Sequence, residues 1–176
     1  MRTLKFATSD KNQLHFSAAV RKNVNDYFKE KGIPQTANYA MVLQTIVMLS
    51  LYIVPFILIL TIPMNIWVAL GLVIVMGLGT AGIGMSVMHD AVHGSYSRKE
   101  WVNKMFGSSM YLLGSNVFNW KVQHNILHHT NTNIDGFDGD IDSKGPIRLS
   151  HSAPYKKFHR YQHFHAFFFY GLMTLS

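Results

Sequence analysis

The sequence predicts an all-α integral membrane protein: a transmembrane helical hairpin and the start of a third span, with amphipathic interfacial helices and a cytoplasmic face that carries histidine clusters. Two observations predict this class. No charged side chain occurs between Gly32 and Met88, although 14% of the 176 residues are charged. All 16 lysines and arginines lie before or after that stretch. A folded soluble domain needs a wetted face, which so long a segment without charge does not provide.

Two apolar stretches within the charge-free region are long enough to cross a bilayer. Residues 41–62 and 66–87 each reach the roughly 20 residues that span about 30 Å of hydrocarbon. Residues 63–65 leave room only for a tight turn, so we predict a hairpin whose two ends return to the same side. Because both outer flanks are basic, the positive-inside rule places the N-terminus and the chain after Met88 in the cytoplasm.

An amphipathic helix is predicted in the N-terminal arm, residues 1–33. Gly32 ends this helix because glycine accepts the left-handed conformation, and Pro34 cannot continue the backbone ladder. Apolar residues at four-residue steps form one side, and charged residues form the other. We expect the apolar side to lie on lipid headgroups, with packing against another domain as the alternative. The apolar positions are Phe16, Val20, Val24 and Phe28.

Residues 88–164 are predicted to form a cytoplasmic and interfacial region. Ser97 and Glu100 form a capping box that begins a helix, and an apolar stripe continues well beyond it. Residues 131–154 are rich in Asn, Asp, Gly, Ser and Pro and predict a loop. Residues 165–176 turn strongly apolar but stop short of the length of a span, so we expect a third membrane segment that is truncated here.

Any metal in this protein must be held by nitrogen and oxygen, because the chain has 10 histidines and no cysteine. The lack of cysteine excludes disulfides, thiolate zinc sites and iron–sulfur clusters. The net charge of +7 flanks an apolar block and does not cover one soluble face. This arrangement favours a lipid bilayer as the partner and argues against nucleic acid.

Two histidine clusters follow the second predicted span. His89 and His93 are four residues apart, so both rings lie on one helical face and can chelate one ion. In the second cluster, HNILHH, His124 and His128 share a face, whereas His129 is rotated by about 100° and can reach a neighbouring ion. The clusters predict a two-metal site of imidazoles, which suits iron, copper or zinc. Solvated interfacial histidines are the alternative interpretation.

The motifs HDAVH and WKVQHNILHHTNTNIDGFDGDID resemble the first two histidine boxes of the membrane-bound fatty acid desaturases, and they are most similar to the bacterial linoleoyl-CoA desaturase type. The resemblance implies a di-iron enzyme that uses O₂ and two electrons to place a cis double bond in a fatty acyl chain. It implies an acyl-CoA or acyl-lipid substrate and an external electron donor of the ferredoxin or cytochrome b5 type. It also implies that the iron ligands are His89, His93, His124, His128 and His129.

The same resemblance suggests residues that orient the ligands, and it predicts no catalytic residue beyond the ligands themselves. Trp120 is a candidate for lining an acyl tunnel, with an interfacial anchor as the alternative role. The third histidine box of the family is absent, and His163 and His165 do not replace it. We therefore expect that these residues alone do not assemble a stable di-iron centre. The candidate orienting residues are Asp90, Asn125, Asp138 and Asp142.

Two other functions are compatible with the sequence. A membrane di-iron lipid hydroxylase would use the same ligands and differ in how the substrate radical is resolved, giving an alcohol. A non-enzymatic membrane module would hold haem between paired histidines and would show a Soret band.

Overall fold

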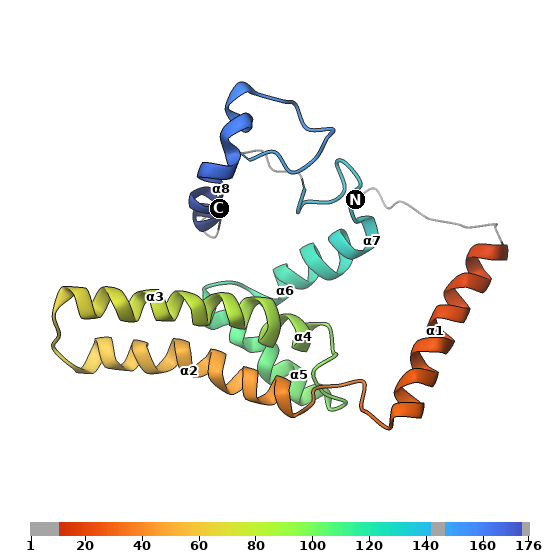
Figure 1. Ribbon diagram of the computed structural model, residues 1–176, viewed down its shortest axis with the longest axis horizontal. Helices are drawn as coiled ribbons and strands as arrows, with labels where there is room; N and C mark the ends of the chain where they lie inside the picture. The colour runs from red at the N-terminus through yellow and green to blue at the C-terminus, as the bar shows by residue number, and fades with distance from the viewer. Residues whose placement is uncertain (1–10, 142–146, 174–176) are drawn as a thin grey trace. The chain divides into compact units, whose positions relative to one another are not determined.

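The computed structural model describes residues 11–141 and 147–173 (Figure 1). These residues form helices, turns and loops, and they contain no strand. The all-α class predicted from the sequence is therefore confirmed for the described part. The chain divides into two compact units, Met1–Val117 and Phe118–Ser176.

The first unit begins with α1, Lys11–Lys31, which ends where the sequence predicts. Gly32 has a left-handed backbone with φ of 62°. The Gly32 N–H donates to the Lys29 carbonyl and the Ile33 N–H to the Phe28 carbonyl, both at 3.2 Å. These two bonds satisfy carbonyls that the last helical turn leaves free, which is why the helix stops here.

Two long helices form the predicted hairpin: α2, Tyr39–Thr61, and α3, Ile66–Gly82. The second helical run continues through the π-helix η1, Ile83–Met88, into α4, His89–Val92. Asn38 and Asn65 cap the two helices through side-chain oxygens that accept from Met41 N–H and Trp67 N–H. Both runs are long and apolar enough to cross a membrane.

The helices of the hairpin approach each other closely at Gly79. A Cβ atom added there would lie 2.7 Å from the Tyr52 backbone nitrogen and 2.9 Å from the Leu51 carbonyl carbon. At Gly82 an added Cβ would meet the flexible Met48 side chain, whereas at Gly77 nothing lies within 4 Å. Close approach therefore explains only part of the glycine content of the second helix.

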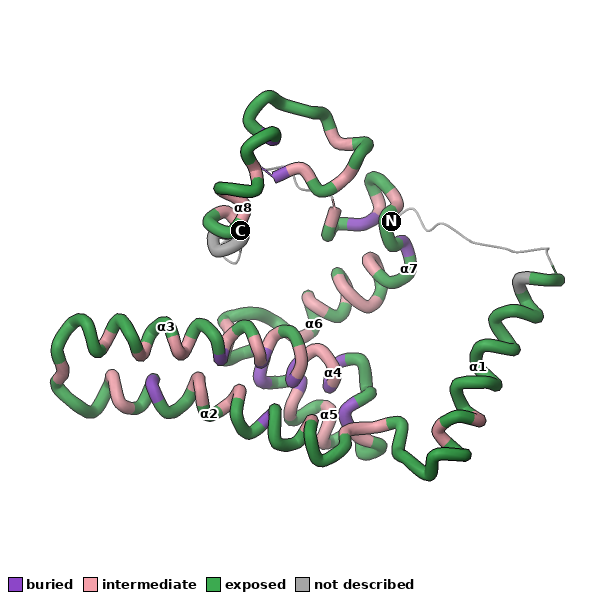
Figure 2. Tube along the Cα trace, in the orientation of Figure 1, coloured by how far each residue is buried: buried purple, intermediate pink, exposed green. Residues whose placement is uncertain are grey.

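The core of the first unit lies at the end of the hairpin where α4 meets α5, Glu100–Gly107, and the 3₁₀ helix η2, Ser108–Leu113 (Figure 2). The Tyr52 hydroxyl donates to the Leu112 carbonyl at 2.9 Å, which ties α2 to η2. This core fixes the helical turn that carries the first histidine cluster. Its buried apolar residues are Ile83, Val87, Met88, Ala91, Val92, Tyr96 and Met110.

Two local predictions in this unit are wrong. The residue before α5 is Lys99, which makes no side-chain cap, so Ser97 and Glu100 do not form a capping box. Asn103 instead accepts from the Ser97 N–H at 2.8 Å and donates to the Ser97 carbonyl at 2.7 Å. The predicted long helix also ends at Gly114, whose φ of 73° is incompatible with a continuing right-handed helix.

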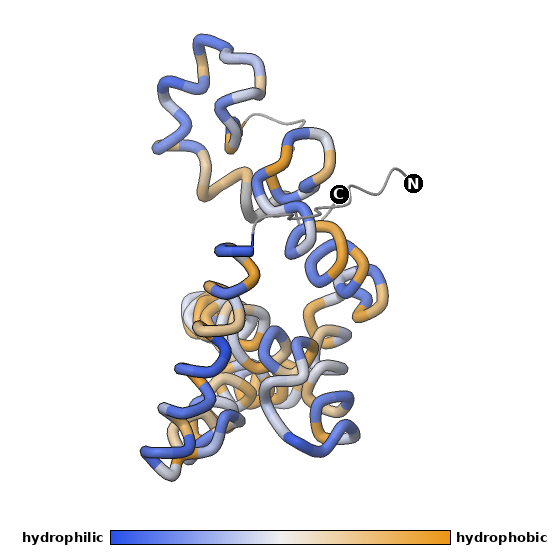
Figure 3. The backbone as a smooth tube through the Cα atoms, turned by 90° about the vertical axis from the view of Figure 1, so that its right-hand side faces the viewer, coloured by the Kyte–Doolittle hydropathy of each residue, from blue (hydrophilic) through white to orange (hydrophobic). Residues whose placement is uncertain are grey.

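The second unit begins within α6, Val117–Trp120, and continues through the π-helix η3, Lys121–His128, and the short α7, His129–Asn131. The described residues after α7 form the predicted loop, until η4, Lys157–Tyr161, and α8, Gln162–Met173. Figure 3 shows this loop mainly in hydrophilic colours.

The Gln162 side chain closes the loop before α8. Its oxygen accepts from the Arg148 N–H at 3.0 Å, and its amide donates to the Arg148 carbonyl at 3.2 Å. Helix α8 has 12 residues in the described part, so a third span stays a prediction.

Candidate metal site

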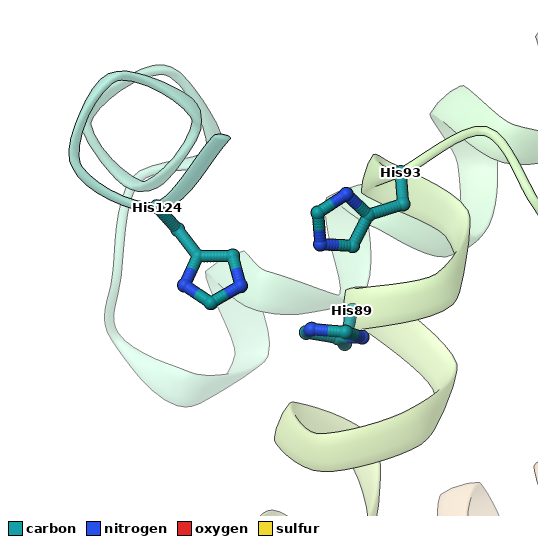
Figure 4. Close-up of side chains that lie close together, drawn as sticks. All are labelled: His89, His93 and His124. Atoms are coloured by element: carbon teal, nitrogen blue, oxygen red, sulfur yellow. The ribbon is translucent and has the colours of Figure 1, made fainter. Parts of the chain in front are cut away.

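The first histidine pair lies on one helical turn of the first unit. His93 N–H donates to the His89 carbonyl at 3.1 Å, which confirms that the two residues are four apart on a continuous helical turn. Their ring centroids are 4.5 Å apart with planes inclined by 67°. Figure 4 shows both rings projecting from the same side of the helix, and it also labels His124 of the second unit. This geometry is suitable for binding one ion through both rings.

The second cluster differs from the prediction because its helix is a π-helix. In an α-helix, His129 would lie about 140° around the axis from His124. A π-helix closes i→i+5 hydrogen bonds, and here the His129 N–H donates to the His124 carbonyl. The wider turn places His129 on the same side as His124, so the prediction that His129 points to a different side is wrong.

The rings of His124 and His129 meet through their Nε2 atoms, which are 3.2 Å apart. Two nitrogens that each lie about 2.1 Å from one ion are separated by about 3 Å, so this distance fits a shared metal ion. The same contact is a hydrogen bond when one ring carries a proton at Nε2. The donor set of neutral imidazoles suits iron, copper or zinc.

His128 is oriented by a buried carboxylate. Its Nδ1 lies 3.0 Å and 3.1 Å from the two oxygens of Asp138, whose side chain is fully buried. Because the carboxylate only accepts, Nδ1 carries the proton and the Nε2 lone pair of the neutral ring is left for a metal. This contact supports the expectation that Asp138 orients a metal ligand, which stays a prediction.

The loop after α7 is folded around the Asp138 carboxylate. Asn133 N–H donates to one oxygen at 2.8 Å, and Asp140 N–H donates to the other at 3.0 Å. Burial raises the pKa of Asp138, but these bonds and the His128 ring outweigh it, so the pKa lies below its usual value. The hydrogen bond to Asp138 and the charges of Asp138 and Asp140 raise the pKa of His128, against the effect of burial.

Asp140 belongs to the acidic stretch from Asp135 to Asp142, for which the resemblance implies a ligand-orienting or structural role. Its Oδ2 lies 3.4 Å from His128 Nδ1 and 3.7 Å from His124 Nδ1. One possible ligand atom from each of these three residues lies within 4.8 Å of the other two, so the three residues could hold one metal ion. The sequence does not show which carboxylate of this stretch faces the histidines.

The other predicted orienting residues have different positions. Asp90 Oδ1 lies 3.3 Å from His89 Nδ1, so it contacts a predicted ligand. Asn125 is half-buried in η3, and its role stays a prediction. Asp142 lies outside the described residues. The Trp120 ring stacks on His124 with centroids 4.2 Å apart and planes inclined by 28°, so it supports a predicted ligand.

A further histidine, His159, is buried, and its ring accepts a hydrogen bond from the backbone. Its Nδ1 accepts from the Lys156 N–H at 3.1 Å, so Nε2 carries the ring proton and has no lone pair for a metal. Burial, followed by the charges of Lys156, Arg148 and His165, lowers the pKa of His159. This residue therefore does not extend the set of metal ligands in the second unit.

Comparison with known proteins gives the class to which this fold and these histidines belong. The fatty acid desaturase family matches residues 64–176, which include both histidine clusters. The chain belongs to this family. The resemblance predicted from the histidine motifs is therefore confirmed.

Curated relatives agree with this assignment. The chain is 35% identical over 155 residues to the sn-1 linoleoyl-lipid 6-desaturase of Arthrospira platensis, a match that covers 88% of this chain and 42% of that protein. It is 31% identical over 176 residues to the acyl-lipid (8-3)-desaturase of Physcomitrium patens, covering 99% of this chain and 36% of that protein. The chain thus spans about two fifths of the length of these relatives. No solved structure matches it.

Proposed function

We propose that this chain provides iron-binding residues of an O₂-dependent desaturase that introduces a cis double bond into a fatty acyl chain. The balanced reaction is –CH₂–CH₂– + O₂ + 2 e⁻ + 2 H⁺ → –CH=CH– + 2 H₂O. Bound iron would supply the binding and reduction of O₂. The observation that best supports this proposal is the arrangement of the second histidine cluster in a segment matched by the desaturase family.

The residues of the second cluster have distinct roles in this proposal. His124 and His129 bind one iron ion through the Nε2 atoms that face each other at 3.2 Å. His128 binds iron through Nε2, while Asp138 holds the proton on Nδ1 and fixes the plane of the ring. In the first unit, His89 and His93 supply two more iron ligands from one helical turn.

The proposed substrate is an acyl chain carried by a membrane lipid. The named relatives act on acyl-lipid or linoleoyl-lipid substrates, and two helices of this chain have the length and composition of membrane spans. We propose that the α2–α3 hairpin crosses the bilayer with both outer ends on the cytoplasmic side, because its basic residues lie outside the hairpin. An external donor of the ferredoxin or cytochrome b5 type supplies the two electrons.

A chimaera tests this function directly. In it, this chain replaces the matched segment of the Arthrospira desaturase, and the protein is produced in a host whose membrane lipids contain the acyl substrate of that enzyme. We expect a new double bond in the host fatty acids, located by mass spectrometry. We also expect iron in the purified protein, and His129→Ala should abolish the product and reduce the iron content.

The control is His151→Ala, because His151 is exposed and its contact within the described part of the chain is a hydrogen bond from Arg148 to its backbone carbonyl. This variant should form product as the unsubstituted chimaera does. An alcohol in place of the double bond would favour lipid hydroxylation. A chimaera that accumulates in the membrane but neither binds iron nor forms product would contradict the proposal.

A further inference from the structure

We propose that α1 lies along the surface of an anionic leaflet, with its apolar stripe between the lipid headgroups and the acyl chains. The stripe follows one side of the helix at three- and four-residue steps. Three of the predicted apolar side chains are strongly exposed, with Phe16 at 71%, Val20 at 43% and Val24 at 48% of their accessible surface, whereas Phe28 is half-buried. Tyr27 lies on the same side of the helix and is 52% exposed. This inference rests on the proposed membrane insertion of the hairpin but not on the iron chemistry.

A helix of this kind needs a surface to cover its apolar side. Most of the stability of an amphipathic helix comes from packing of its apolar face and not from the intrinsic helix propensity of its residues. The described helix is exposed over nearly its whole length, and only Asp26 and Phe28 are half-buried. The stripe is continuous, so its burial would stabilise the helix and remove the exposed aromatic rings from water.

The junction between α1 and α2 brings the helix to the end of the hairpin. After Gly32 the chain needs only a few residues to reach Asn38, the cap of α2. The Ala37 N–H donates to the Tyr96 carbonyl at 3.0 Å, which fixes the linker to the loop that follows His93. Figure 1 shows α1 running across the direction of α2 and α3. A helix across the direction of spanning helices, at their basic end, lies in the plane of the headgroups.

The charges of α1 favour anionic lipid as the partner. Five cations and two carboxylates give the helix a net charge of 5 − 2 = +3. One cation, Lys22, pairs with Asp26 at 2.7 Å, an exposed pair that costs little to rearrange. Each free cation near an anionic leaflet strengthens surface binding by about fivefold. The charged residues are Lys11, Arg21, Lys22, Asp26, Lys29, Glu30 and Lys31.

Spin labels on single cysteines test the placement of α1, because the chain has no cysteine of its own. The full chain is reconstituted in nanodiscs of phosphatidylcholine with phosphatidylglycerol. A label at Val20→Cys reports the apolar stripe, and a label at Ala18→Cys reports the opposite side at a similar side-chain size. A label at Val54→Cys, on an exposed position of α2, reports whether the hairpin is inserted.

We expect the Val20 label to be accessible to oxygen but not to a water-soluble nickel reagent, and the Ala18 label to show the reverse. Arg21→Gln with Lys29→Gln should weaken surface binding of α1 by about 25-fold in anionic nanodiscs, at about fivefold per cation. Nanodiscs of phosphatidylcholine alone should likewise reduce the difference between the two labels.

Three results would overturn the proposal while the Val54 label still reports insertion. A Val20 label protected from both reagents would mean that protein covers the stripe. Equal nickel accessibility at Val20 and Ala18 would mean that α1 is free in water. No response to anionic lipid would contradict the choice of partner. A Val54 label accessible to nickel would instead contradict the proposed insertion of the hairpin, which separates the two failures.

Discussion

Replacement of Asp138 by Asn tests the arrangement that orients His128. The two Asp138 oxygens accept from His128 Nδ1, Asn133 N–H and Asp140 N–H at 2.8 to 3.1 Å. An asparagine keeps one oxygen and presents an NH₂ group in place of the other. One of the surrounding donors then faces another donor inside a fully buried site.

The expected magnitudes follow from this geometry. A buried donor that loses its acceptor costs about 1–3 kcal/mol of the free energy of unfolding. Loss of the group that orients a metal-binding imidazole weakens metal binding by about 10–100-fold. In the chimaera described above, Asp138→Asn should show both effects. The measurements are iron(II) affinity by competition with a coloured chelator, and thermal unfolding in detergent without metal.

The matched control is Asp135→Asn, which removes the same charge from an exposed position of the same loop. We expect its iron affinity and its unfolding temperature to be unchanged. Equal losses of iron affinity in Asp135→Asn and Asp138→Asn would refute the reasoning, because overall charge and not orientation would then determine binding. Unchanged iron affinity in Asp138→Asn would refute the role given to the carboxylate.

Two further predictions concern stability. Gly79→Ala should lower the free energy of unfolding in detergent by about 1–3 kcal/mol, because its Cβ meets backbone atoms of α2. Gly77→Ala should raise the same free energy by up to about 1 kcal/mol, because its Cβ meets nothing within 4 Å. Equal effects of the two variants would contradict the close approach of the helices at Gly79. Because the pKa of His128 is raised, the His128 side chain stabilises the folded protein below the ordinary pKa of histidine. This contribution to the free energy of unfolding is lost as pH rises through the raised pKa. Because the pKa of Asp138 is lowered, the Asp138 carboxylate stabilises the folded protein above the ordinary pKa of a carboxyl group. This contribution to the free energy of unfolding is lost as pH falls through the lowered pKa. A pH profile of unfolding should therefore show a maximum between these limits, and Asp138→Asn should flatten it.

The hairpin could be predicted from the sequence because its signal is simple. Two stretches of the length of a membrane span carry no charge, and a tight turn separates them. Few folds other than a transmembrane helical hairpin are compatible with this pattern. The helix after the first cluster was less predictable. Its end at Gly114 and the bridge from Asn103 to Ser97 depend on backbone angles and contacts that the apolar stripe does not encode. The capping motif in the sequence does not form because Ser97 makes hydrogen bonds with Asn103 instead.

The candidate site was predicted in its residue types but not in its internal geometry. The four-residue spacing of His89 and His93 gives the observed pair because that helical turn is regular. In the second cluster the same rule fails for His129, because a π-helix has no local sequence signal comparable to a cap or a turn. Which aspartate faces the histidines depends on how the loop folds around its buried carboxylate, and composition alone does not select one.

The π-helix η3 links metal binding to the stability of one backbone hydrogen bond. The backbone bond from His129 to His124 and the contact between their rings join the same two residues. An ion held by both rings therefore stabilises the wide turn by the free energy of binding, and a turn that relaxes to α-helical geometry releases the ion. The amide proton of His129 should then exchange with solvent more slowly as iron is added, so one backbone hydrogen becomes a measure of occupancy.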